Sequence, residues 1–271
     1  MTDAALELVL RRDRAITAAA LAAVATLAWA YVLWLAAHMG LSDAGMPGMT
    51  MRGMGDLVTP SLHPWSAAEF IFTLTMWAVM MVGMMTPAAA PMILIYARVG
   101  RQAAMQGKPL AATGWFAAGY LLTWVAFSLV ATSAQWALER VALLTPMMAS
   151  ASNGFGGIVL VAAGLYQWTP LKDVCLRQCR FPLIFIQRHG GFRQDTAGSL
   201  ALGFRHGAYC VGCCWALMAL LLVGGVMNVL WVAALAILVL LEKVVPAGRV
   251  ISRIAGIGLT ATGTWLLTAA P

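Results

Sequence analysis

The sequence predicts an all-α fold: a polytopic membrane helix bundle that forms a single domain over residues 1–271. Of the 271 residues, 62% are hydrophobic and 10% are charged, and a soluble domain of this length could not bury so much apolar surface. Uncharged runs recur along the whole chain without the alternating pattern of membrane β-strands. The net charge of +7 does not indicate a nucleic-acid partner, because the basic residues lie between apolar runs, where they act as topology signals.

Seven apolar segments are expected to span the membrane, given a rise of about 1.5 Å per residue and a hydrocarbon core of about 30 Å. The first follows a short polar stretch, and its length favours an uncleaved helix over a signal peptide. The last two are short for this thickness. The approximate spans are 16–37, 70–97, 110–138, 148–170, 199–223, 227–245 and 254–270, with an outer loop at 38–64 and a cytoplasmic, cysteine-containing loop at 172–193.

The positions of the basic residues predict the orientation. If the N-terminus is cytoplasmic, fourteen of the 17 Lys and Arg residues fall in cytoplasmic segments, and Arg205 lies just inside the fifth span on the same side. Only Arg52 and Arg140 then fall outside. This positive-inside pattern predicts a cytoplasmic N-terminus and an outer C-terminus, as expected for a multi-pass protein of the bacterial inner membrane.

The fifth span contains most of the soft metal donors, in the stretch 203–218, GFRHGAYCVGCCWALM. On a helix, His206, Cys210 and Cys213 lie at i, i+4 and i+7 and therefore share one face, with Cys214 beside it. Thiolates and imidazole are the ligands that thiophilic ions such as Cu(I) or Zn(II) require. Because these donors spread over more than two turns, they cannot all reach one ion. A metal site here must borrow ligands from other helices.

Packing is the alternative to ligation, because buried cysteines are often inert and Gly207 and Gly212 suit close helix contacts. The cytoplasmic loop offers two more thiols, Cys175 and Cys179, one helical turn apart. They could hold an ion, or they could face lipid on an interfacial helix.

Two charged residues, Glu242 and Lys243, lie near the end of the sixth span. Their charges are costly in lipid unless they are compensated or the side chains extend to the headgroups.

The outer loop at 38–64 contains five methionines within sixteen residues and is bracketed by His38 and His63. Thioethers bind Cu(I) but hold hard ions poorly. An interfacial loop whose methionines dip into lipid is the alternative. With thioethers outside and thiols near the cytoplasmic side, the expected arrangement suits a Cu(I) ion that passes between an oxidising and a reducing compartment.

The second span carries a row of methionines at Met76, Met80 and Met84, spaced at i, i+4 and i+8. Pro87 and Pro91 each remove a backbone hydrogen bond, so we expect this helix to kink or open near Gly83–Pro87. A methionine row is ordinarily core packing. One that ends at a double-proline break is also a candidate path for a soft metal.

The sequence does not indicate hydrolase or transferase chemistry. It contains no HExxH motif, no P-loop, no GxSxG motif and no pair of carboxylates at catalytic spacing. Its ten acidic residues lie mostly in expected loops. We therefore do not expect an ordinary hydrolytic enzyme.

Several blocks together resemble a bacterial family labelled "predicted metal-binding integral membrane protein". The resemblance covers roughly residues 70–255 and does not extend to the methionine-rich loop. It implies a bound metal and leaves the ion and the activity open. The blocks are MWAVMMVGMMTPAAAPM (76–92), GLYQWTPLKDVCLRQCRFP (164–182), GFRHGAYCVGCCWALM (203–218), GVMN (225–228) and EKVVP (242–246).

We therefore expect a membrane protein that transports or delivers copper(I), with zinc as the alternative ion. A membrane assembly factor or metalloenzyme that retains its metal, and a structural subunit with packing cysteines, are the competing functions. Besides the lipid bilayer, a metallochaperone or another membrane subunit would be the partner. The expected metal ligands are Cys210, Cys213, Cys214 and His206 as the principal site, Cys175 and Cys179 as an exit or second set, and Met76, Met80 and Met84 as the inward path.

Overall fold

The computed structural model describes residues 3–44, 65–144 and 149–269, and these residues confirm the predicted all-α fold. The one pairing between extended residues in this part of the chain is the isolated bridge of Leu144 with Ser150. The helices are α1 (Asp3–Ala44), α2 (Ala67–Met105), α3 (Thr113–Arg140), α4 (Asn153–Tyr166), α5 (Pro170–Arg180), α6 (Pro182–Arg188), α7 (Thr196–Ala219), α8 (Leu221–Gly224), α9 (Val229–Val244) and α10 (Gly248–Thr268).

Five stretches are long and apolar enough to cross a membrane: 15–38 in α1, the helices α2, α3 and α10, and 196–224, which combines α7 and α8. The fourth and sixth expected spans correspond to α4 and α9, which have 14 and 16 residues. At 1.5 Å per residue they are about 21 and 24 Å long, less than the roughly 30 Å hydrocarbon core. The expected outer loop 38–64 is helical up to Ala44, and its remainder lies outside the described residues.

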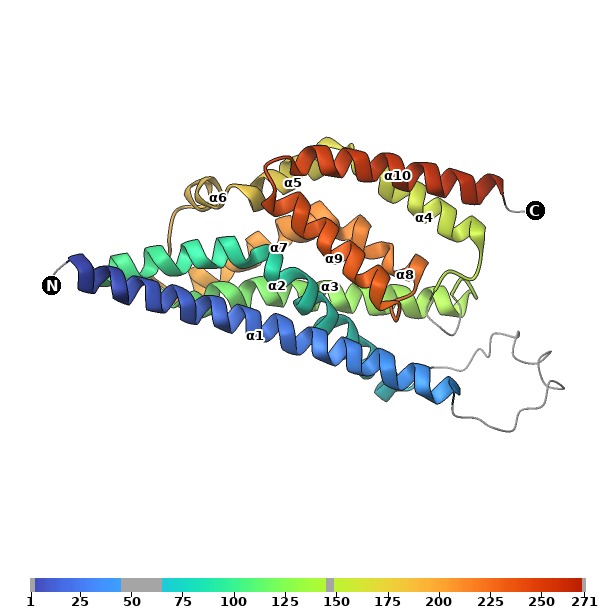
Figure 1. Ribbon diagram of the computed structural model, residues 1–271, viewed down its shortest axis with the longest axis horizontal. Coiled ribbons are helices and arrows are strands. Elements are labelled where there is room, and N and C mark those ends of the chain that lie inside the picture. Colours follow the sequence, from blue (N-terminus) through green and yellow to red (C-terminus); the bar gives the residue numbers. More distant parts are fainter. Residues whose placement is uncertain (1–2, 45–64, 145–148, 270–271) are drawn as a thin grey trace.

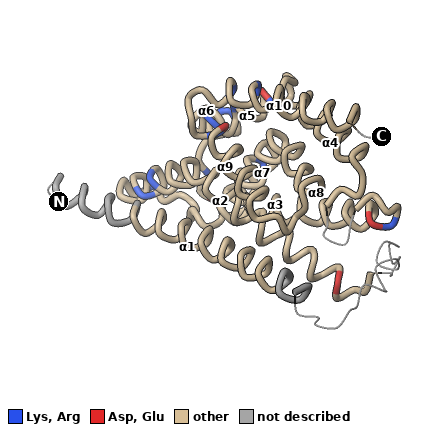
Figure 2. The backbone as a smooth tube through the Cα atoms, turned by 45° about the vertical axis from the view of Figure 1, so that its right-hand side comes forward, with Lys and Arg blue, Asp and Glu red and all other residues tan. Residues whose placement is uncertain are grey.

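Helices α7 and α9 lie in the middle of the molecule (Figure 1). On one side are α1, α2 and α3, and on the other are α4 and α10. Helix α7 contacts α3 and α5, and α9 contacts α2 and α10. Most charged residues lie towards the ends of the helices (Figure 2), which is the distribution that a membrane protein requires.

Local sequence signals explain where the central helices begin. Asp195 caps α7 by accepting a hydrogen bond from the backbone N–H of Gly198, and Asn228 caps α9 in the same way. Thr169 caps α5, and Pro170 occupies its first turn, where the missing N–H is not needed. These caps fix the starts of α5, α7 and α9.

Helix α2 remains helical through Pro87 and Pro91, and it bends partway along its length (Figure 1). This is the effect expected of two residues that lack a backbone N–H. Helix α1 packs against α2 beside the bend, where a methyl group at Gly83 would lie 3.1 Å from the Cβ of Ala28.

Helices α3 and α7 cross in backbone contact. A methyl group at Gly119 would lie 2.0 Å from the carbonyl oxygen of Leu200, and one at Gly203 would lie 2.0 Å from that of Phe116. One at Gly207 would lie 2.4 Å from Thr123 Oγ1. Small residues permit this approach in the same way as in small-residue contacts between membrane helices. The crossing places the aromatic face of α3 directly against the His206–Cys210 segment of α7.

Substitution of Gly119 tests the backbone contact. We expect Gly119→Ala to lower the free energy of unfolding by about 1–3 kcal/mol, because the methyl group forces the helices apart. Gly114→Ala in the same helix is the matched control, since no atom lies within 4 Å of the added methyl group. Thermal unfolding in detergent measures both variants, and equal stability of the two would contradict the close crossing.

Candidate metal centre

The candidate ligands of α7 face the interior. His206, Cys210, Cys213 and Cys214 are all buried, and the five cysteines of the chain are free thiols. The thiols of Cys213 and Cys214 donate to the carbonyl oxygen of Cys210 at 3.1 and 2.9 Å. These hydrogen bonds within one helix pair the buried thiols. A metal that binds the sulfurs would replace them.

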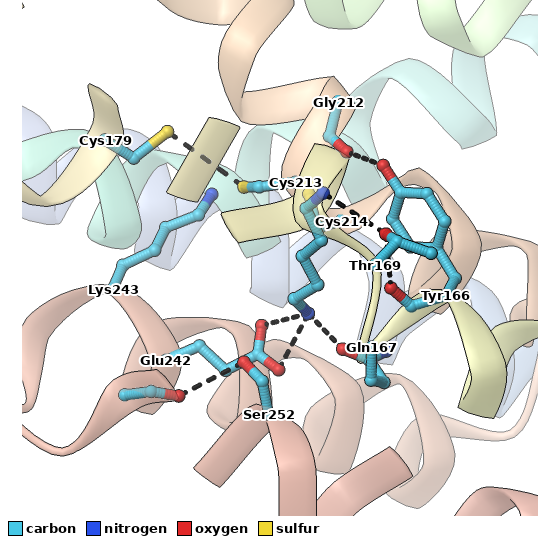
Figure 3. Close-up of polar contacts among 12 residues, drawn as sticks. Tyr166, Gln167, Thr169, Cys179, Gly212, Cys213, Cys214, Glu242, Lys243 and Ser252 are labelled. Carbon is cyan, nitrogen blue, oxygen red and sulfur yellow. Dashed lines mark hydrogen bonds and ion pairs between the residues drawn. The ribbon is translucent and has the colours of Figure 1, made fainter. Parts of the chain in front are cut away.

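Helix α5 brings its thiols to α7, as a ligand set spread over two helices requires. Cys179 Sγ lies 4.0 Å from Cys213 Sγ (Figure 3). Cys175 packs one turn away, where its Sγ would lie 2.8 Å from a methyl group at Gly212. Of the two α5 cysteines, Cys179 is therefore the one whose sulfur meets an α7 sulfur, and Cys175 packs over Gly212.

Both α5 thiols are protonated in the metal-free protein at neutral pH. Hydrogen bonding with the side chains of Cys210 and Cys213, together with burial, raises the pKa of the Cys179 thiol well above its usual value. Burial raises the pKa of the Cys175 thiol. A metal that binds either sulfur must displace its proton.

Tyr120 connects the bent helix α2 to the α7 thiols. Its hydroxyl donates to the carbonyl oxygen of Met85 at 3.1 Å and lies 3.1 Å from Cys210 Sγ. The predicted methionine row is buried in the same apolar core cluster as the α7 cysteines. The Tyr120 hydroxyl therefore contacts both the backbone of Met85 in α2 and the sulfur of Cys210 in α7.

Lys243 contacts the same sulfur. Its ammonium donates to Cys210 Sγ at 2.8 Å, and Figure 3 shows its side chain extending towards the Cys179–Cys213 pair. Glu242 and Lys243 are 0% and 7% exposed. Extension of these side chains to the headgroups, one of the two sequence-based interpretations, is therefore wrong, because both side chains lie inside the protein.

Glu242 is compensated by Lys172 of α5. The Lys172 ammonium lies 2.9 and 2.8 Å from the two carboxylate oxygens and also donates to Gln167 Oε1 (Figure 3). This pair joins α5 to α9 beneath the cysteines. Sequence reasoning missed Tyr120, Lys172 and Gln167. The available signal was the position of Lys172 and Gln167 within a single sequence block with Cys175 and Cys179.

His206 lies among aromatic rings. Its ring centroid is 6.0 Å from that of Phe116, 5.7 Å from that of Tyr120 and 5.1 Å from that of Phe185. Its Nδ1 is buried and has no hydrogen-bond partner among the described residues. Buried polar atoms are normally paired, so this nitrogen is available as a metal ligand.

The two sulfurs at 4.0 Å can bind one ion without a large movement. At a metal–sulfur distance of about 2.3 Å they would subtend an angle of about 120°. Over the described ranges, no three His, Cys, Asp or Glu side chains form a ready-made metal-binding group. A closed zinc site needs four protein ligands, so the arrangement is better suited to an ion that accepts two or three soft ligands.

One comparison with known proteins gives a match. Residues 74–266, more than half of the chain, match the family model of PpoB2, described as a copper chaperone. The matched range contains the blocks 76–92, 164–182 and 203–218, which carry the resemblance to a metal-binding membrane family, and its description names copper as the metal. No curated protein and no solved structure gives a significant match.

Substitutions in the Lys172–Glu242 pair test how much the pair matters for stability. Glu242→Gln leaves the Lys172 ammonium buried without its carboxylate, which we expect to cost about 3–5 kcal/mol of unfolding free energy. Removal of both charges in Lys172→Met/Glu242→Leu should restore most of this loss.

The control is Asp173→Asn, which breaks the more exposed pair of Asp173 with Arg249 and should cost about 0–1 kcal/mol. Thermal unfolding in detergent compares the variants. A loss in Glu242→Gln no larger than in the control would contradict the buried pair.

Proposed function

The chain belongs to the PpoB2 family of copper chaperones, and we propose that it is an inner-membrane protein that binds Cu(I) among the thiols of α5 and α7 and delivers it to a partner. The approach of Cys179 to Cys213 on separate helices is the observation that carries this proposal. Thiolates are soft ligands that suit Cu(I). Delivery requires a site that binds firmly and can exchange, and thiols already engaged in weak internal bonds meet both needs.

The principal site would combine the α7 donors with one α5 thiol. Cys213 and Cys179 are the first pair, and Cys210 lies one turn before Cys213 on the same buried face. Cys214 and His206 complete the α7 set of candidate donors, which spreads over more than two turns, so one ion would bind only part of it. The orphaned Nδ1 of His206 supports its place there, since a neutral imidazole is a suitable third ligand for a soft ion.

The methionine row would lead copper to this site. Met76, Met80 and Met84 are buried along α2, and Tyr120 links the same helix to Cys210. Successive thioethers offer weak, exchangeable ligands for Cu(I). Cys175, one turn from Cys179, would receive the ion as it leaves. A metallochaperone or another membrane subunit would be the partner.

We propose seven membrane segments with a cytoplasmic N-terminus and an outer C-terminus. The five long apolar helices support most of this arrangement. Helix α4 packs against α10, and α9 packs against α2, so both short helices can cross within the bundle where neighbouring helices shield their ends. This topology puts α5, with Cys175 and Cys179, on the cytoplasmic side.

Single thiol variants test the ligand set. Cys179→Ser and Cys213→Ser should each lower Cu(I) affinity by roughly 100-fold or more, since even outer-shell partners of a metal ligand are worth about 10–100-fold. Cys175→Ser is the matched control and should have a smaller effect. Anaerobic competition with a chromophoric Cu(I) chelator on detergent-purified protein gives the three affinities.

Two outcomes would contradict the proposal: absence of stoichiometric Cu(I) binding by the unmodified protein, or equal affinities in all three variants. Incubation of the copper-loaded protein with a soluble thiol-containing Cu(I) acceptor then separates delivery from retention. A chaperone transfers its copper, whereas a metalloenzyme or an assembly factor that retains its metal does not.

Reporter fusions test the topology. Alkaline phosphatase, which is active only outside the cytoplasm, should be active when fused after residue 271 and inactive when fused after residue 188, because odd and even segment numbers place these points on opposite sides. Activity at both points, or the reverse pattern, would contradict the seven-segment arrangement.

A further inference from the structure

The buried interior holds an excess of positive charge. Among the described residues, the buried Lys, Arg, Asp and Glu side chains are Lys172, Glu242 and Lys243. Glu242 is bound through both carboxylate oxygens by Lys172, so these two neutralise each other. The remaining charge is the ammonium of Lys243, and the group that it contacts is the sulfur of Cys210.

This ammonium completes the charge balance of a site that binds a monovalent ion. Metal-bound cysteines are thiolates, so two thiolates with Cu(I) carry one net negative charge. The positive charge of Lys243 brings the total to zero. A neutral third donor, such as the imidazole of His206 or a thioether, leaves this balance unchanged.

A divalent ion cannot reach the same balance with two thiolates. Two thiolates with Zn(II) are neutral, and the Lys243 ammonium then stands as an uncompensated charge inside the bundle. Such a charge is costly in a low-dielectric interior. A third thiolate would restore neutrality for Zn(II), but the sulfurs that meet across α5 and α7 are those of Cys179 and Cys213, and Cys210 Sγ accepts from the Lys243 ammonium.

We propose that Lys243 is the residue that makes this site selective for monovalent copper over zinc, by supplying the one positive charge that a two-thiolate Cu(I) complex lacks. The inference rests on the proposed function, since it concerns the same thiols. Lys243 acts here as a positioning and selectivity residue and is not itself a ligand. Geometry supports it independently of the family, because the ammonium points at the candidate site and its neighbouring carboxylate is already occupied.

The test is the ratio of Cu(I) to Zn(II) affinity, each measured with the metal alone against a chromophoric chelator on the full-length protein in detergent. Lys243→Leu removes the charge and leaves an apolar side chain without a metal donor. It should lower the ratio on the order of tenfold or more, because the Cu(I) complex loses its compensating charge and the Zn(II) complex loses its excess. Lys243→Arg keeps the charge and should keep a ratio close to that of the unmodified protein.

The double variant Lys172→Met/Glu242→Leu is the matched control, since it removes a buried lysine together with its partner and leaves the net charge unchanged. It should leave the ratio unchanged. The ratio is measured on the same folded fraction, so partial unfolding does not alter it. An unchanged ratio in Lys243→Leu, or an equal shift in the double variant, would overturn the inference. If the unmodified protein does not bind Cu(I), the proposed function is overturned, and the inference with it.

Discussion

Backbone contact between α3 and α7 is the constraint on which the metal centre depends. Gly119 and Gly203 leave no room for a side chain at the crossing, so the two helices are held at a fixed register. That register sets the Tyr120 hydroxyl beside Cys210 and puts aromatic rings around His206. Gly203 and Gly207 of α7 therefore serve the contact with α3, while Cys213 of the same helix meets Cys179 of α5.

The second constraint is the cost of charge in an apolar interior. Two consecutive residues of α9, Glu242 and Lys243, point to different partners: the first holds Lys172 of α5 and the second faces Cys210 of α7. Helix α9 therefore ties together the two helices that carry the cysteines. An ion pair whose only role was stability would be replaceable by apolar residues at little loss. Here the pair joins α5 to α9, and the next residue of α9 contacts Cys210 of α7.

The sequence predicted the parts of this centre that depend on one helix. The spacing of His206, Cys210 and Cys213 placed them on one face, and the structure buries that face. A metal site also needs donors from another helix, and α5 places the sulfur of Cys179 4.0 Å from that of Cys213. Periodicity does not identify the helix opposite, so the Tyr120 bridge and the Lys243 contact could not be foreseen. A lysine near the end of a span looks the same in sequence whether it reaches the headgroups or turns inward.

Whether Cu(I) binds between the thiols of α5 and α7 can be tested by X-ray absorption at the copper edge. The sample is the purified full-length protein loaded with one equivalent of Cu(I). The account predicts a first shell dominated by two or three sulfur atoms at about 2.3 Å, and the loss of this shell when Cys179 and Cys213 are both replaced by serine. A first shell of nitrogen and oxygen alone, or a sulfur shell that persists without these two cysteines, would contradict it.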